Sequence, residues 1–306
     1  MMFAQPQTIQ TEIFAELPEE LHWKGGKTEW LEGRPWGVPG SFLEGPGFDR
    51  DGNLLCVDIP YGRVFRIAPN GKFELFVQYD GEPNGLRIHR DGRIFVADHK
   101  RGLLVIDSDT RQVDVLVGSI EGKPLVGPND LVFAPSGDVY FTDMGNSDLA
   151  TPNGRLIRVD PSGRASVVLD QLAAPNGLGL NKAGTVLYLA MFRENAIWQM
   201  TLRPDGSASR VSRFLQLSGG LGPDGLLVDD DGNVLVVHAG LGCVWVFSPL
   251  GEPLYRIVSC RGRMITNIAF GVDEPDRLYI VDSSSGTILT AKLPIRGRLP
   301  FSHCDN

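Results

Sequence analysis

One unit recurs six times along this chain, and this repetition limits the possible folds more than any other feature. Each copy has a turn with a polar residue, a short apolar run, a turn of the Asp-Gly type, and two further apolar runs. Successive polar residues, here called anchors, are separated by 40, 45, 47, 48 and 43 residues. The anchors are Glu44, Asn84, Asn129, Asn176, Asp224 and Asn267. Repeats of this length are typical of propellers and solenoids.

The fifth copy shows what one unit predicts. Its apolar runs over Gly225–Val228, Val234–Ala239, Val244–Ser248 and Leu254–Ser259 are short, and turn residues separate them. These features indicate four β-strands. No window of similar length has the 3.6-residue period of an amphipathic helix. Six four-stranded units predict an all-β protein, a six-bladed β-propeller in which each sheet buries both faces against its neighbours.

The repeats divide the chain into two parts. We expect residues 41–306 to form the propeller, and residues 1–40 to form an N-terminal extension that does not fit the repeat. The extension either packs on the outside of the propeller or supplies the closing strand of the last blade, and the sequence leaves both open. Four tryptophans, Trp30, Trp36, Trp198 and Trp245, are interpreted as core or blade-packing residues.

Composition and charge exclude several kinds of partner. The net charge of −8 argues against nucleic acids and anionic membranes, and it does not oppose a cation or a neutral small molecule. None of the four cysteines forms a CxxC pair, and Cys56 and Cys243 lie in apolar runs typical of the core. Neither a secretory signal nor a membrane span is visible, so we expect a cytoplasmic protein. The oligomeric state cannot be read from the sequence.

The anchors have a shared chemistry. The innermost strands of a propeller line its central channel, so anchors that open these strands would converge near the axis. One Glu, one Asp and four Asn provide only oxygen ligands, which suit hard divalent cations. Asn and Asp before Gly are also common turn formers, which is the competing interpretation of any single copy. A polar residue in all six copies favours a functional ring, and Glu44 is the anchor least expected in a turn.

These residues carry a resemblance to a known family. The region from Leu43 to Leu293 resembles the family of senescence marker protein (regucalcin), bacterial gluconolactonases and luciferin-regenerating enzyme. The most specific matching segments are Glu44–Pro46, Gly127–Leu131, Pro175–Leu178, Pro223–Leu226, His238–Gly242 and Gly286–Leu289.

The resemblance implies a propeller lactonase with one catalytic divalent cation. By motif match, Glu44, Asn176 and Asp224 correspond to the metal ligands, and Asp224 also corresponds to the proposed general base. Asn129 corresponds to a residue that touches the metal shell and the substrate. The ion is expected to be Ca²⁺, while Mg²⁺, Mn²⁺, Zn²⁺ and Fe²⁺ remain alternatives.

Other residues are candidates for substrate contacts. Asn84 and Asn267 occupy the anchor position in their own copies, and they either contact substrate hydroxyls or structure the channel. His99 follows the second-strand run Phe95–Asp98 and His238 follows the apolar residues Val234–Val237, and for both a substrate contact and a capped loop histidine are open. Aspartates that end second strands are expected to hydrogen-bond turn backbone between blades; these are Asp98, Asp143 and Asp282.

The expected reaction is the opening of a sugar-type lactone. The cation would polarise the carbonyl, and water would attack with Asp224 as base, although a hydroxide on the metal is the rival nucleophile. Two alternatives stay open: a metal-dependent phosphotriesterase or fluorophosphatase, and a non-enzymatic calcium-binding propeller.

Overall fold

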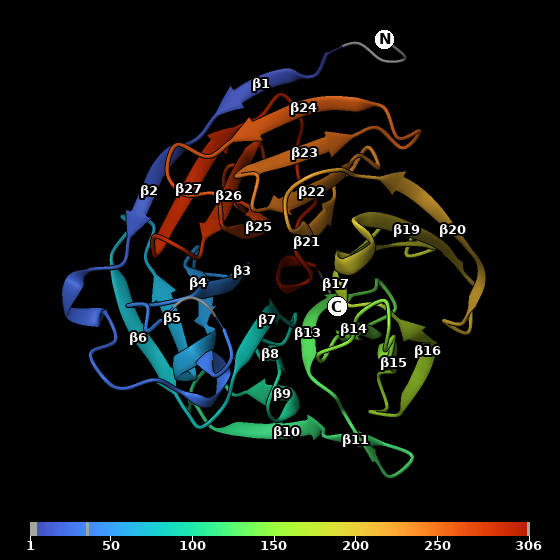
Figure 1. The fold of residues 1–306 in the computed structure, drawn as a ribbon, viewed down its shortest axis with the longest axis horizontal. Helices are drawn as coiled ribbons and strands as arrows, with labels where there is room; N and C mark the ends of the chain where they lie inside the picture. The colour runs from blue at the N-terminus through green and yellow to red at the C-terminus, as the bar shows by residue number, and fades with distance from the viewer. Residues whose placement is uncertain (1–4, 35–36, 305–306) are drawn as a thin grey trace.

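Six β-sheets surround a central axis, which confirms the predicted six-bladed propeller (Figure 1). The computed structural model describes residues 5–34 and 37–304, so Trp36 lies outside the described residues. The secondary structure over these ranges consists of strands and short 3₁₀ helices. No helix in the described ranges is long and apolar enough to cross a membrane.

Each blade has two inner strands that run antiparallel to each other. The innermost strands are β3 (Leu43–Phe48), β7 (Pro83–Ile88), β13 (Pro128–Phe133), β17 (Pro175–Leu180), β21 (Gly222–Val228) and β25 (Ile265–Phe270). The second strands are β4 (Leu54–Asp58), β8 (Ile94–Asp98), β14 (Val139–Asp143), β18 (Val186–Met191), β22 (Val234–Ala239) and β26 (Arg277–Asp282). The innermost strands all begin at one end of the channel, called here the upper mouth.

Two outer strands complete each blade. The third strands are β5 (Arg63–Ile67), β9 (Gly102–Ile106), β15 (Gly154–Val159), β19 (Ala196–Leu202), β23 (Cys243–Phe247) and β27 (Thr287–Lys292). The fourth strands are β6 (Phe73–Gln78), β10 (Val113–Val117), β16 (Ala165–Leu172), β20 (Ala208–Gln216), β24 (Pro253–Val258) and β2 (Glu12–Glu16).

Smaller elements lie between the blade strands. A short hairpin connects the second and third blades through β11 (Ser119–Ile120) and β12 (Lys123–Pro124). The 3₁₀ helices are η1 (Glu19–Leu21), η2 (Glu29–Leu31), η3 (Ile59–Tyr61), η4 (Phe192–Glu194) and η5 (Phe301–His303).

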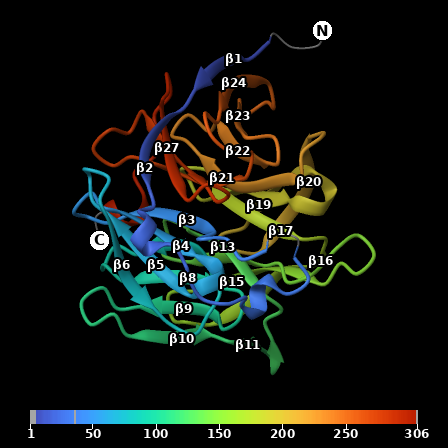
Figure 2. The same cartoon turned by 60° about the vertical axis from the view of Figure 1, so that its left-hand side comes forward.

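The N-terminal residues pair with the last two blades. Strand β2 runs antiparallel to β27 and is the outer strand of the sixth blade. Strand β1 (Gln7–Gln10) runs parallel to β24 and adds a fifth strand to the fifth blade. Both views show this segment along the outside of the ring (Figures 1 and 2). Both ends of the chain therefore contribute strands to the sixth blade, and their pairing closes the ring.

The core lies between neighbouring blades, because each sheet has apolar side chains on both faces. Leu235 and Val237 of β22, for example, pack with Ile268 and Ile280 of the sixth blade in one buried cluster. Burial of each such side chain stabilises the fold by about 1.5–3 kcal/mol. Cys56 and Cys243 are buried free thiols, and Trp30 is buried as expected.

Aspartates at the ends of second strands hold the loops of the upper mouth. The Asp98 carboxylate accepts a hydrogen bond from the Glu82 backbone N–H at 2.9 Å. Asp143 accepts one from Gly127 at 2.8 Å, and Asp282 is likewise bonded to backbone of the turn before its own blade. The predicted role of these aspartates is confirmed.

The C-terminal segment covers the opposite end of the channel, the lower mouth. Helix η5 lies at the centre of the ring in Figure 1. The Phe301 ring stacks on Phe133 with 4.7 Å between centroids, and the Ser302 hydroxyl donates a hydrogen bond to the Phe48 carbonyl. A mainly apolar cavity of about 110 Å³ lies between this segment and the inner strands. The upper mouth is therefore the end from which a polar ligand would reach the anchors.

Candidate active site

The six anchors lie in innermost strands, near the upper mouth. In each innermost strand the pairing register shifts beside the anchor, as between Glu44 and Gly47 or between Pro175 and Leu178. Equivalent shifts occur in the other four blades. A bulge bends a strand locally and re-aims a side chain, and bulges are frequent next to active sites.

The glycine after an anchor allows close approach between innermost strands. A Cβ atom on Gly177 would lie 2.3 Å from the Asp224 carbonyl oxygen, and one on Gly85 would lie 2.6 Å from the Asp130 Cα. Real Cβ atoms do not approach backbone this closely. The Pro-Asn-Gly segments therefore begin innermost strands, and their glycines serve packing around the axis rather than a hairpin turn.

Asp130 is a site residue that the sequence reasoning missed. It fills the position that Gly occupies after four of the other anchors, and its side chain is fully buried. Its carboxylate lies 3.7 Å from an Arg87 guanidinium nitrogen and accepts a hydrogen bond of 3.3 Å from the Asn267 amide. The third and sixth blades are opposite each other, so this hydrogen bond spans the channel. The change from Pro-Asn-Gly to Pro-Asn-Asp was the available signal.

Glu44 is a buried carboxyl group with little compensation. Its side chain is 3% exposed and accepts a 2.7 Å hydrogen bond from the Gly45 backbone N–H. Burial raises the pKa of Glu44 to about 7, and the charge of Asp130 adds to the rise, while hydrogen bonds from Gly45, Thr266 and Asn267 oppose it.

Asp224, which is half-buried in the fifth blade, is also close to other carboxyl groups. Burial raises the pKa of Asp224 well above its usual value, the charges of Glu44 and Asp130 raise it further, and a hydrogen bond from Asn176 lowers it. The three predicted metal ligands therefore interact with one another. The charge of Glu44 raises the pKa of Asp224, and the Asn176 amide donates a hydrogen bond to the Asp224 carboxylate.

These residues fit a hard divalent cation. Over residues 5–34 and 37–304, neither Glu44 nor Asp224 forms an ion pair with Lys, Arg or His. Buried negative charge without a partner is costly, and a cation held by oxygen atoms would compensate it. Within the same ranges, no three His, Cys, Asp or Glu side chains converge as a metal cluster. The predicted set contains only two such residues, and its third ligand is the asparagine.

Three predicted substrate-binding residues line one pocket beside this ring. Asn84, Asn129 and His99 border a pocket of about 170 Å³ near the upper mouth. The Asn129 amide also contacts the Met144 sulfur at 3.4 Å. Burial lowers the pKa of His99, and the charge of Arg34 lowers it further, so the imidazole is neutral at pH 7.

The other two predicted substrate contacts lie outside the lining of this pocket. Asn267 is 2% exposed, its amide donates a hydrogen bond to Asp130, and its side-chain oxygen accepts one from the Ile268 backbone N–H. His238 is 1% exposed, and its Nε2 lies 2.9 Å from the Gly219 carbonyl oxygen. Their substrate contacts stay predictions.

The fold and the ring define a class of protein: a six-bladed β-propeller with buried carboxylates and amides at one mouth of its channel. Residues 42–284 match the family model of the SMP-30/Gluconolactonase/LRE-like region. The chain belongs to this family, as its motifs indicated.

Known proteins similar to this chain include enzymes and a binding protein. A gluconolactonase of Zymomonas mobilis is 32% identical over 261 residues, which cover 74% of this chain and 72% of that protein. Lactonase drp35 of Staphylococcus saprophyticus is 30% identical over 240 residues, with 75% and 72% covered. The calcium-binding protein regucalcin of Agrobacterium tumefaciens has the same fold, with a TM-score of 0.79, 18% identity, and 97% and 98% of the two chains covered.

Proposed function

We propose that this protein is a metal-dependent lactonase that opens a sugar-type lactone at the upper mouth of its propeller. Glu44, Asn176 and Asp224 would hold one divalent cation. The observation that carries the proposal is that the carboxyl groups of Glu44 and Asp224 interact with each other and with the amide of Asn176, while no Lys, Arg or His among the described residues pairs with either carboxyl group. A bound cation would oppose the rise in the pKa of both carboxyl groups and keep them ionised. The gluconolactonase and lactonase relatives support lactone hydrolysis as the activity.

The chain's own residues would divide the work of the reaction. When bound, the cation would polarise the lactone carbonyl and keep both carboxyl groups ionised. Asp224, at the channel wall, would accept the proton of the attacking water. Asn84 and Asn129 would orient the ring hydroxyls, because both amides line the adjoining pocket. Asp130 and Asn267 would hold the floor of the site through the hydrogen bond that spans the channel.

A lactone panel with controlled metal content tests this function. The protein is treated with a chelator, and acid release from sugar lactones and from one organophosphate is followed before and after Ca²⁺, Mg²⁺, Mn²⁺, Zn²⁺ or Fe²⁺ is restored. We expect lactone opening that disappears on chelation and returns with one of the ions. Turnover of the organophosphate alone would favour the phosphotriesterase function, and ion binding without turnover would favour the calcium-binding propeller.

A variant tests the assignment of the base. Asp224→Ala should abolish lactone opening while its circular dichroism spectrum stays that of a folded β-protein. Lactonase activity retained by this variant in the presence of the ion would reject Asp224 as the base.

A further inference from the structure

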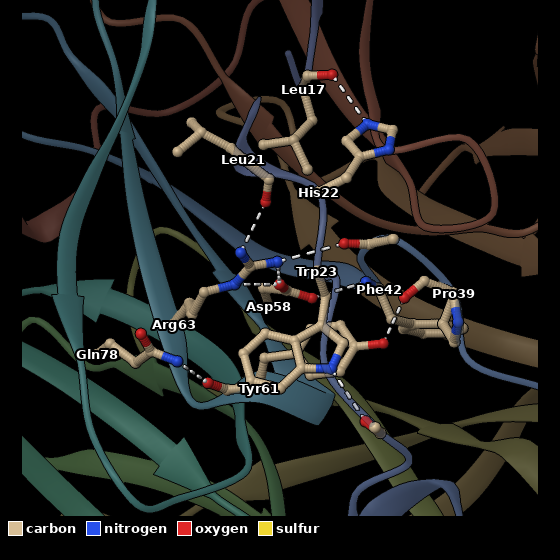
Figure 3. A network of polar contacts seen from close by, with 12 residues as sticks. Leu17, Leu21, His22, Trp23, Pro39, Phe42, Asp58, Tyr61, Arg63 and Gln78 are labelled. Carbon is tan, nitrogen blue, oxygen red and sulfur yellow. Dashed lines mark hydrogen bonds and ion pairs between the residues drawn. The ribbon is translucent and has the colours of Figure 1, made fainter. Parts of the chain in front are cut away.

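Part of the N-terminal extension forms a loop over the upper mouth, called here the cap loop (residues 22–40, of which 22–34 and 37–40 are described). The Trp23 backbone N–H donates a 2.7 Å hydrogen bond to the Gly40 carbonyl, which closes the neck of the loop. The Arg63 guanidinium donates hydrogen bonds to the carbonyls of Leu21 and Gly40, on the two sides of this neck (Figure 3).

The base of the cap loop is fixed to the first blade. The buried Asp58 carboxylate accepts hydrogen bonds from the Arg63 Nε at 2.8 Å and from the Phe42 backbone N–H at 2.7 Å. The Trp23 and Tyr61 rings stack with 4.5 Å between centroids (Figure 3). The ion pair of Asp58 and Arg63 on the first blade therefore holds the base of the cap loop in place.

The tip of the cap loop supplies one wall of the pocket beside the anchors. Trp30 and Arg34 line this pocket together with Asn84, His99 and Asn129. The Arg34 Nε donates a 2.6 Å hydrogen bond to the Trp30 carbonyl, and the guanidinium lies 4.0 Å above the Trp30 ring. A guanidinium fixed in this way keeps its donors in one orientation, so a ligand loses little additional entropy on binding it.

The pocket wall carries positive charge. A second guanidinium, that of Arg193, comes from η4 of the fourth blade, and no Asp or Glu is among the described residues that line the pocket. Arg34 also lines an adjoining groove that contains Glu29, Glu32, Glu82 and Lys100. Burial lowers the pKa of Arg34, and the charge of the half-buried Glu82 opposes this shift. Two arginines therefore line one pocket of a chain with a net charge of −8, and the Arg193 guanidinium lies 5.4 Å from the centre of the neighbouring Phe192 ring.

We propose that Arg34 and Arg193 select lactones that carry an anionic group, a carboxylate or a phosphate, away from the ring carbonyl. This inference rests on the proposed function, since it places the lactone ring at the anchors and its far end in the pocket. Carboxylate and phosphate oxygens match the donor geometry of guanidinium groups, which bind them in pairs of hydrogen bonds. A neutral sugar lactone offers these two arginines no anionic oxygen.

Paired substrates measure the selection. The ratio of kcat/KM for 6-phosphoglucono-1,5-lactone or glucaro-1,4-lactone to that for glucono-1,5-lactone is determined for the metal-loaded protein and its variants. We expect a ratio above one for at least one anionic lactone. Arg34→Gln and Arg193→Gln should each lower this ratio roughly 10- to 100-fold, the value of a charge-assisted hydrogen bond. The control, Arg210→Gln, changes an exposed arginine on β20 that does not line the pocket and should keep the wild-type ratio.

The two anionic substrates show whether the arginines bind a phosphate or a carboxylate. A ratio that falls only for the phosphorylated lactone assigns phosphate, and one that falls only for the glucarolactone assigns carboxylate. Equal ratios in wild type and in both variants would refute the selection. Arg193 is exposed, so Arg193→Gln keeps the experiment decisive if the Arg34 variant does not fold.

Binding of products separates this inference from the proposed function. D-glucarate has one carboxylate more than D-gluconate and is otherwise its counterpart. Calorimetric titration should give a Kd at least 10-fold lower for glucarate, and Arg34→Gln should remove the difference. If no lactone is opened but this difference is found, the proposed reaction fails and the anion site stands. If lactones are opened but the two acids bind equally in wild type and variant, the anion site fails.

Discussion

Glu44→Gln should change how the stability of the metal-free protein depends on pH. The pKa of Glu44 rises from 4.5 to about 7 on folding, mainly because the group is buried. Between these two values the folded state keeps a proton that the unfolded state releases, so the free energy of unfolding falls as pH rises. The shift of about 2.5 units corresponds to a loss of about 3 kcal/mol that is complete above pH 7. Glutamine cannot ionise, so this loss is absent in the variant.

Urea unfolding in the presence of a chelator, at several pH values from 4.5 to 8, measures this effect. The stability of Glu44→Gln relative to wild type should rise by about 3 kcal/mol across this range. Glu252→Gln, which changes an exposed carboxylate, should show no such trend. A divalent cation at 100 times its Kd should stabilise wild type at pH 8 by about 2.7 kcal/mol. A constant difference between wild type and Glu44→Gln at all pH values would refute the reasoning.

Three further changes test the packing. Gly177→Ala should lower the free energy of unfolding by about 2 kcal/mol, because the new Cβ would collide with the backbone of the next blade. The control Gly26→Ala has open space around the new Cβ, so its free energy of unfolding should stay within about 0.5 kcal/mol of wild type. Arg63→Leu leaves the buried Asp58 carboxylate without its cation and should cost about 3–5 kcal/mol in urea unfolding, with earlier proteolytic cleavage of the cap loop. Phe301→Ala removes a ring stack, which should cost about 1 kcal/mol and admit a hydrophobic fluorescent dye at the lower mouth.

The propeller could be predicted because the pattern of apolar runs and turn residues that defines one blade is local and recurs in every repeat. Each unit carries its own strand pattern, so the strands predicted in the fifth copy match β21 to β24 within a few residues. The anchors could be located for the same reason, since equivalent positions in equivalent strands must converge when the ring closes. Asn129 and Glu44 therefore lie near the upper mouth, where the repeat placed them.

Features outside the repeat could not be derived in this way. Arg63 holds the cap loop through hydrogen bonds to the carbonyls of Leu21 and Gly40. These residues are distant from Arg63 in sequence, and no repeated pattern marks them. The parallel pairing of β1 with β24 depends on an exposed edge that the sequence does not mark. Asp130 was overlooked because it follows an anchor, where the other repeats suggested a turn residue. The role of Asp130 depends on the closed ring, in which Asn267 of the opposite blade donates a hydrogen bond to the Asp130 carboxylate.

Titration of the chelator-treated protein with Ca²⁺ and, separately, Mn²⁺ at pH 7.5 tests the central claim most directly. Calorimetric titration should give a stoichiometry of one bound ion per chain for at least one of the two metals. Glu44→Gln and Asp224→Asn should each weaken binding of that ion at least 100-fold, since each removes a charged ligand, while Glu252→Gln should bind it as wild type does. Binding of either ion with unchanged affinity and stoichiometry in the double variant Glu44→Gln, Asp224→Asn would contradict the account.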